Sequence, residues 1–201
     1  MSSKNGFSTV ELMVSVALFS AVVAMTIAAL MVMIDANQKA RSVKIAMDNL
    51  NLVIDDMSRS LRLGSKYYCQ QDANPAIPNG LSTNDCPFVN NITSGGVFIR
   101  FRDHNRKVVF YRFDGTCIQK KVTDANWLDG YTDNLSGYAC ITGSDVTFNR
   151  VRFYVSNTAL NSGAQPYVQI VVSGTVGAKQ STQTSFSIMT SVSQRIPHNV
   201  E

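Results

Sequence analysis

The sequence predicts an α+β protein in which one long N-terminal helix packs on two small antiparallel β-sheets. The first observation is a run from Phe7 to Leu63 that contains neither glycine nor proline, as an unbroken helix requires. The second is a change beyond residue 96 to short segments that alternate apolar and polar residues, which is typical of strands. A long helix followed by two groups of strands is typical of the α+β class.

The first half of the helical run is apolar enough to cross a membrane. From Leu12 to Ile34 only Ser15, Ser20 and Thr26 interrupt the apolar residues. At about 1.5 Å per residue this stretch spans roughly 35 Å, whereas the hydrocarbon core of a bilayer is about 30 Å thick. We therefore expect a membrane-spanning segment.

A carboxylate, Glu11, stands at the head of this apolar stretch. At the centre of a membrane helix a charge costs about 2.5–3.5 kcal/mol, and less near the end, so Glu11 needs a partner. Cleavage between Gly6 and Phe7 would create a new amine nearby in the chain. An amine and a carboxylate on different subunits would neutralise each other where the dielectric constant is low.

The sequence Gly6-Phe7, followed by Ser-Thr-Val-Glu and an apolar helix, resembles the processing site of type IV pilins and of the pseudopilins of type II secretion and DNA uptake. The resemblance implies that a prepilin peptidase cuts after Gly6 on the cytoplasmic side and methylates the Phe7 amine. It also implies that Glu11 guides docking into a growing filament. The alternatives are a secretory signal peptide and a plain membrane anchor. A signal peptide would be cut after its apolar core, and no small-residue site follows Ile34.

The resemblance divides the chain into four segments. These are a leader (1–6), a transmembrane and filament-core helix (7–34), the amphipathic half of the same helix (35–64) and a C-terminal β-rich globular domain (65–201).

Two further segments are similar to one group within this family. The helix end from Asp48 to Gly64 and the closing segment from Ser191 to Pro197 look like the minor pilins that include the J-type pseudopilins and the W-type minor pilins. The resemblance implies a minor subunit that acts in filament initiation or at the tip. Its implied partners are other minor pilins, the major pilin, the inner-membrane assembly platform and, before assembly, membrane lipid.

The implied location is the cytoplasmic membrane, with a single pass and the C-terminal domain outside the cytoplasm, and then a cell-surface or periplasmic filament. Positive charge favours the inverse orientation, because Lys4 precedes the span and Lys39, Arg41 and Lys44 follow it. The cysteines argue against that inversion, because all of them lie beyond the span.

An even number of cysteines, namely Cys69, Cys86, Cys117 and Cys140, predicts disulfides in an oxidising compartment. Three pairings are open. The shortest loops favour Cys69–Cys86 and Cys117–Cys140, and buried free thiols are the alternative. No C-x-x-C pair is present, so structural zinc is not expected.

The second half of the helix carries an apolar stripe on an otherwise polar surface. Its members are Val43, Met47, Leu50, Ile54, Met57 and Leu61. This spacing predicts a helix face that packs on a sheet, and the matched charges of a free coiled coil are missing. Gly64 is the expected C-cap. A helix of about 85 Å exceeds one globular domain, so we expect half of it to lie outside.

Residues 65–96 are rich in proline, glycine and asparagine and predict an irregular segment, as do residues 124–145. Two groups of three strands are expected around the second of these segments. They are Val97–Arg102, Val108–Phe113 and Thr116–Val122 before it, and Val146–Val155, Tyr167–Val176 and Thr184–Val192 after it.

Catalytic chemistry is not expected. Only two histidines are present, His104 in a turn and His198 near the C-terminus, so neither a catalytic triad nor a histidine metal site can be assembled. With 45% hydrophobic and 16% charged residues, the composition also argues against a disordered tail or a multidomain enzyme. No cofactor is expected, although aspartates in the 124–145 loop leave calcium open as a ligand.

A nucleic-acid patch on the first strands is the sharper alternative. Arg100 and Arg102 share a strand face with Phe98, and Arg112 follows on the next strand. Basic residues interleaved with aromatics are typical of single-strand binding surfaces. This hypothesis makes the protein a DNA-binding or adhesive tip pilin of a competence or attachment pilus. A solvated sheet face, with arginines paired to nearby aspartates, is the competing interpretation.

Overall fold

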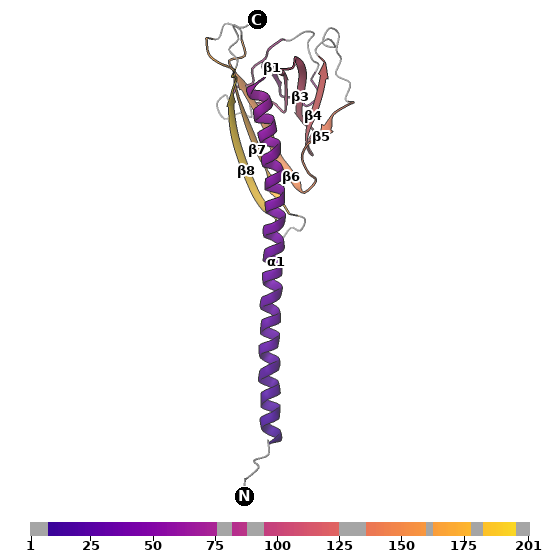
Figure 1. The fold of residues 1–201 in the computed structure, drawn as a ribbon, viewed down its shortest axis with the longest axis vertical. Coiled ribbons are helices and arrows are strands. Elements are labelled where there is room, and N and C mark those ends of the chain that lie inside the picture. Colours follow the sequence, from indigo (N-terminus) through magenta and orange to yellow (C-terminus); the bar gives the residue numbers. More distant parts are fainter. Residues whose placement is uncertain are drawn as a thin grey trace. The chain divides into compact units, whose positions relative to one another are not determined.

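The fold is described from a computed structural model. The structure describes residues 8–75, 82–87, 95–124, 136–159, 163–177 and 183–195. One long helix is followed by a five-stranded and a three-stranded antiparallel sheet (Figure 1). The predicted α+β class is confirmed. The chain separates into two compact units, Met1–Ser42 and Val43–Glu201.

The helix α1 runs from Thr9 to Arg62. The first sheet has the order β1-β2-β3-β4-β5, with strands Ser65–Gln70, Phe98–Arg102, Lys107–Phe113, Ile118–Asp124 and Ala139–Cys140. The second sheet has the order β6-β7-β8, with strands Val146–Ser156, Tyr167–Val176 and Thr184–Ser193.

In the first unit, the polar residues within the apolar stretch of α1 bond to the helix itself. The Ser15 hydroxyl donates to the Glu11 carbonyl oxygen at 2.7 Å, the Ser20 hydroxyl to that of Val16 and the Thr26 hydroxyl to that of Val23, each at 2.8 Å. A hydroxyl that is satisfied within its own helix adds little cost in an apolar medium. These three residues are therefore compatible with a membrane segment.

In the second unit, the apolar stripe of α1 is buried as expected. Leu50, Ile54, Met57 and Leu61 are buried and belong to one core that both sheets share. Further helix residues in the same core are Ala46 and Val53, with Val43 and Met47 packed against it. The second half of the helix thus belongs to the same compact unit as the sheets.

The C-terminal end of α1 is held by bonds from other elements. The Tyr67 hydroxyl lies 2.5 Å from the Leu61 carbonyl oxygen and 2.8 Å from that of Gly64. From beyond β8, the Arg195 N–H donates to the Arg62 carbonyl oxygen at 2.9 Å. Carbonyls left open by the helix end are thereby satisfied.

Gly64 has a steric role. A Cβ atom on Gly64 would lie 2.5 Å from Cδ2 of Phe101, so a larger residue would push the core ring away. The left-handed backbone expected of a C-cap glycine occurs instead at Lys66, with φ 54°. The prediction of a glycine at the helix end is correct in position, but its reason is the close approach of Phe101.

One strand lies in the segment expected to be irregular, which corrects that expectation. β1 pairs antiparallel with β2, and its Tyr67, Tyr68 and Cys69 are all buried. Because both faces of β1 are covered, its residues do not alternate between apolar and polar, and the sequence pattern is missed. The two-residue β5, also inside an expected loop, exists through its pairing with β4.

The second sheet agrees with the expected strands to within one residue at each end. In β6 the register shifts between Phe148 and Arg150, and a bulge of this kind explains why two exposed residues interrupt the alternation. Gly174 of β7 permits the close approach at this point, since a Cβ there would lie 2.3 Å from the Thr147 carbonyl oxygen.

Replacing a buried stripe residue should destabilise the second unit far more than replacing an exposed residue of the same helix. In a fragment covering residues 43–201, we expect Met57→Ala to lower the free energy of unfolding by about 2–4 kcal/mol, because Met57 is fully buried. Leu52→Ala should change it by less than about 0.5 kcal/mol, because Leu52 is 71% exposed. Urea unfolding followed by circular dichroism measures both; equal losses would contradict the packing described here.

Candidate functional site

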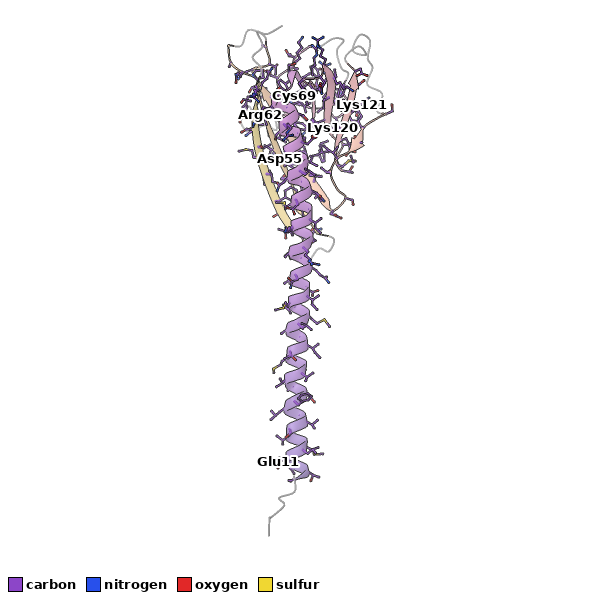
Figure 2. All side chains as sticks on the ribbon, viewed as in Figure 1. Glu11, Asp55, Arg62, Cys69, Lys120 and Lys121 are labelled. Atoms are coloured by element: carbon purple, nitrogen blue, oxygen red, sulfur yellow. A yellow bond between two sulfur atoms is a disulfide. The ribbon has the colours of Figure 1, made fainter. Side chains whose placement is uncertain are left out.

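The candidate site is the first half of α1 with the carboxylate at its head. Glu11 is exposed and lies in the first turn of the helix (Figure 2). It is the only charged residue between Phe7 and Ile34. Gly6 and Phe7, the residues of the expected cleavage site, lie outside the described residues.

An exposed and largely apolar surface surrounds Glu11 and continues along the helix. Every described side chain of the first unit is exposed except Val23, which is half-buried. The large apolar residues on this surface include Val10, Leu12, Phe19, Met25, Met31 and Ile34. The helix is long and apolar enough to span a membrane. An exposed apolar surface of this extent indicates contact with lipid or with apolar surfaces of other proteins.

The position of Glu11 in the first turn gives its carboxylate one local source of stabilisation. Acidic side chains near a helix N-terminus interact favourably with the helix dipole, by about 0.3–1 kcal/mol. Burying a carboxylate in lipid or in a helix bundle costs several times more. The dipole therefore offsets only a small part of that cost, and a cationic partner is still required wherever the apolar surface around Glu11 is covered.

The structure contradicts the prediction that Arg100 and Arg112 belong to an exposed nucleic-acid patch. Arg100 is fully buried and Arg112 is 7% exposed, so these two cannot form an exposed basic stripe. Arg102 is half-buried. The Arg100 guanidinium lies 4.7 Å from the centre of the Tyr68 ring and donates to the Ser82 carbonyl oxygen at 2.7 Å. Burial lowers the pKa of Arg100 to about 10, which leaves it protonated at neutral pH.

Arg112 lies on the same face of the first sheet as Arg100, and its guanidinium also has partners there. Its guanidinium lies 3.7 Å from the centre of the Tyr138 ring and donates to the side-chain oxygens of Gln119 at 2.6 Å and Asn74 at 2.5 Å. Stacking on an aromatic ring and bonds to amide oxygens together compensate a buried cation. The arginines therefore hold the outer face of the first sheet together.

The alternation of apolar and polar residues in β2 predicted that the face carrying Arg100 meets solvent. That prediction is wrong, because a cluster of aromatic residues covers this face. Phe98 and Phe110 form a second small core with Tyr68 and Val108 on the outer face. Both faces of β2 are therefore covered, and its polar residues are buried with the aromatics. The signal available in the sequence was Phe98 itself, an aromatic residue on the same face as Arg100.

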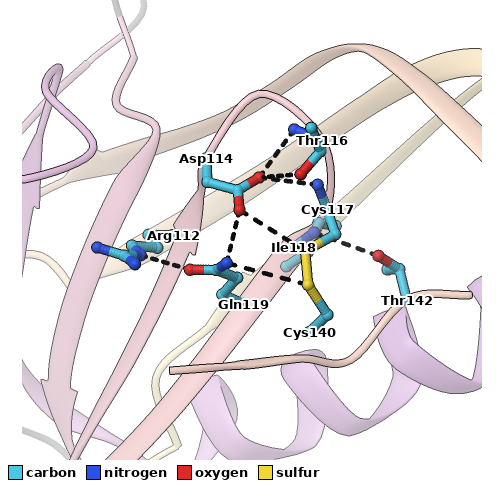
Figure 3. Close-up of a disulfide and its surroundings, with 8 residues drawn as sticks. All are labelled: Arg112, Asp114, Thr116, Cys117, Ile118, Gln119, Cys140 and Thr142. Atoms are coloured by element: carbon cyan, nitrogen blue, oxygen red, sulfur yellow. Dashed lines mark hydrogen bonds between the residues drawn. A yellow bond between two sulfur atoms is a disulfide. The ribbon is translucent and has the colours of Figure 1, made fainter. Parts of the chain in front are cut away.

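Both disulfides follow the pairing with the shortest loops. Cys69–Cys86 joins β1 to the segment 82–87, and Cys117–Cys140 joins the start of β4 to β5 (Figure 3). Within the described residues no cysteine is free. Asp114, Cys117 and Cys140 lie close together, but both sulfurs are bonded to each other, so this cluster offers a cation only one carboxylate.

Asp114 organises the turn that carries Cys117. Its carboxylate accepts hydrogen bonds from the N–H groups of Thr116 at 2.8 Å and Cys117 at 2.9 Å, and from the Gln119 side chain at 2.5 Å (Figure 3). Partial burial raises the pKa of Asp114, but these bonds and the charge of Arg112 outweigh it and lower the pKa below its usual value. The carboxylate is thus ionised at neutral pH and caps the turn.

Calcium remained open as a ligand of the 124–145 loop, and the structure describes only the two ends of this loop. Asp124 lies 3.8 Å from the Lys107 amine, and Asp145 is exposed. Asp129, Asp133 and Asn134 lie outside the described residues, as does His198. His104 is exposed in the turn between β2 and β3.

The fold and the site define an α+β protein with two disulfides and a long N-terminal helix, of which the first half, up to Ile34, is exposed, largely apolar and carries a single carboxylate. Comparison with known proteins found no matching protein-family model, curated protein or solved structure.

The two disulfides should differ in their reactivity towards a mild reductant. Cys69 and Cys86 are buried, whereas Cys140 is exposed, so we expect Cys117–Cys140 to be reduced first. Timed alkylation and mass spectrometry of the peptides measure the order, and simultaneous labelling of all four cysteines in the native protein would contradict it.

Replacing both Cys117 and Cys140 by Ser should lower the free energy of unfolding by about 3 kcal/mol, the amount expected for a loop closed across 23 residues.

Proposed function

We propose that this protein is a minor pilin or pseudopilin, a subunit of a type IV pilus-like or type II secretion-like filament that acts in filament initiation or at the tip. The observation that carries the proposal is the exposed apolar surface along the first half of α1, interrupted by the single charge of Glu11. The sequence Gly6-Phe7, placed immediately before this helix, supports the same function, because it provides for a new amine next to the carboxylate.

The apolar surface allows one segment to serve in two environments. Before assembly, lipid covers the residues from Leu12 to Ile34, and in the filament the helices of neighbouring subunits cover them. Moving an apolar helix from lipid into a helix bundle changes the hydrophobic free energy little, because lipid tails and apolar side chains are similar media. Specificity must then come from polar groups, and Glu11 is the only charged group available along this surface.

Glu11 acts as the docking charge in this mechanism. The methylated amine of Phe7 in a neighbouring subunit and the carboxylate of Glu11 attract each other strongly in a medium of low dielectric constant. A subunit whose carboxylate lacks this partner bears the full desolvation cost. Charge pairing therefore favours a subunit seated in register on its neighbour over one that remains isolated in the membrane.

The second unit, in this proposal, lies outside the cytoplasm. Its two disulfides support that side of the membrane, since disulfides persist in oxidising compartments. The basic residues that follow the span favour the inverse topology, and the disulfides outweigh them here. The burial of Arg100 and Arg112 takes these two residues out of the basic patch on which the DNA-binding alternative was based.

Processing should produce a mature chain that begins with methylated Phe7. When the protein is expressed together with a prepilin peptidase, we expect intact-mass measurement to show the loss of six residues and the gain of one methyl group. Gly6→Leu should block cleavage, because a bulky side chain then stands at the cut, whereas Asn5→Ala should leave it unchanged. A mature chain that starts beyond Ile34 would identify an ordinary signal peptide and refute the proposal.

Removing the charge of Glu11 should impair assembly without affecting membrane insertion. We expect Glu11→Gln to reduce the amount of protein in sheared filaments at least tenfold, because the neighbouring amine then lacks its counter-charge. The membrane-bound amount should not fall, and Glu11→Asp should retain part of the assembly. Ser15→Ala, one turn further along the same helix, is the matched control. Incorporation of Glu11→Gln at the normal level would be incompatible with the docking mechanism.

A further inference from the structure

The second half of α1 carries a ridge of charged and apolar side chains on the side turned away from the core. The members of this outer ridge are all exposed and lie within about 100° of one another around the helix; they are Lys44, Ile45, Asp48, Leu52, Asp55 and Arg59. Ile45 is 55% exposed and Leu52 is 71% exposed. Large apolar side chains that remain exposed among ordered charges are suited to contact with another protein.

The charges of the outer ridge are spaced for ion pairs that the helix itself does not form. Asp48 follows Lys44 by four residues, and Arg59 follows Asp55 by four, a spacing that allows pairing within one helix. The ion pairs found among the described residues are Lys107–Asp124 and Lys120–Asp56, so none of the four ridge charges has a partner there. All four are therefore available to a second molecule, and a merely solvated helix face is the competing interpretation.

A hollow of about 830 Å³ borders the C-terminal part of the outer ridge. Leu52, Asp55 and Arg59 belong to its lining, as does Ser58. The Ser58 hydroxyl oxygen is buried and has no hydrogen-bond partner among the described residues. A side chain that enters a hollow of this kind is the type of anchor on which protein interfaces depend.

We propose that the outer ridge is an interaction surface for the outer ridge of a second copy of this chain. The two helices are parallel, and one copy is displaced along their common direction by four residues, about 6 Å. Lys44 of the displaced copy is then level with Asp48 of its neighbour, and Asp55 of the displaced copy is level with Arg59. This inference rests on the proposed function, because subunits of one filament point in the same direction and are displaced along its axis.

The spacing of the charges is what favours a second copy. The chain itself supplies the cation and the anion of both pairs, and a single displacement brings both pairs level. Without displacement, each ridge charge would be level with the same charge of the other copy. Phe7 and Glu11, whose amine and carboxylate are proposed to pair between neighbours, are also four residues apart. The displacement thus agrees with the proposed docking of Glu11.

The apolar members of the outer ridge fit the same displacement. Ile45 and Leu52 of the displaced copy are level with positions 49 and 56 of its neighbour. The large apolar side chains of the two copies therefore alternate at levels 45, 49, 52 and 56, and helix side chains interdigitate at such spacings of four and three residues. Because Asp56 also lines the hollow, we expect Leu52 of the displaced copy to enter it.

Cross-linking of the full-length chain in lipid vesicles tests the displacement. Chains that carry Ile45→Cys and Asn49→Cys are mixed and treated with a short bifunctional thiol reagent, since the native cysteines are engaged in disulfides. We expect cross-links between positions 45 and 49 to exceed those between two identical positions at least fivefold. Val122→Cys, exposed on β4, is the control and should give almost none. Predominant 45–45 cross-links, or no cross-links along the ridge, overturn the proposal.

Exchanging charges between the copies separates pairing across the interface from pairing within one helix. Lys44→Asp is added to the chain with Ile45→Cys, and Asp48→Lys to the chain with Asn49→Cys. Each charge change combined with an unchanged partner should lower the 45–49 cross-link yield at least fivefold, because like charges then meet. Mixing the two changed chains should restore the yield, although each chain by itself carries like charges at positions 44 and 48. Equal yields in all mixtures, or a yield that is not restored, overturn the proposal.

Failure of this inference is distinguishable from failure of the proposed function. Both cross-linking experiments use uncleaved chains, so their outcome is independent of processing at Gly6. Cleavage after Gly6 and loss of assembly in Glu11→Gln, together with predominant 45–45 cross-links, would refute the outer ridge as the interface and retain the filament subunit. A mature chain that starts beyond Ile34 would refute the filament subunit and with it this inference.

Discussion

The structure of the second unit depends on burial of the apolar stripe of α1. Leu50, Ile54, Met57 and Leu61 are buried in the one large core that receives residues from both sheets. Full burial of such side chains stabilises by roughly 1.5–3 kcal/mol each. By comparison, the ion pair between Asp56 and Lys120, which ties the helix to β4 at 2.8 Å, is partly exposed and contributes at most about 1 kcal/mol. Apolar packing therefore dominates.

The end of α1 is bonded to the segment that follows β8. The last carbonyls of a helix have no hydrogen-bond partners within the helix itself. Tyr67 and the N–H of Arg195 satisfy them. Closing the chain onto the helix end explains why the last described residues, beyond β8, belong to the folded unit.

The same helix carries two surfaces with opposite requirements. In the second unit its stripe is covered by the chain's own sheets, whereas in the first unit every described large apolar side chain except Val23 is exposed. The exposed apolar first half of the helix, with its one carboxylate, must be covered by something outside the chain. In the proposed filament subunit, lipid covers it before assembly and the helices of neighbouring subunits cover it afterwards. Among the described residues, the outer edge of β8 is a second surface without partners, because its backbone hydrogen bonds all go to β7. The two surfaces therefore call for different kinds of partner.

The sequence by itself determined the features that local physics controls. Helix length, the buried stripe and most strands follow from periodicity, because a helix or a one-sided strand displays its environment in the order of its residues. Only the tertiary structure decided the rest. β1 and the burial of Arg100 and Arg112 depend on what covers the outer face of the first sheet, and alternation carries no information once both faces are covered. The tertiary structure likewise decided which segments, distant in sequence, bond to the outer sides of β1 and β6.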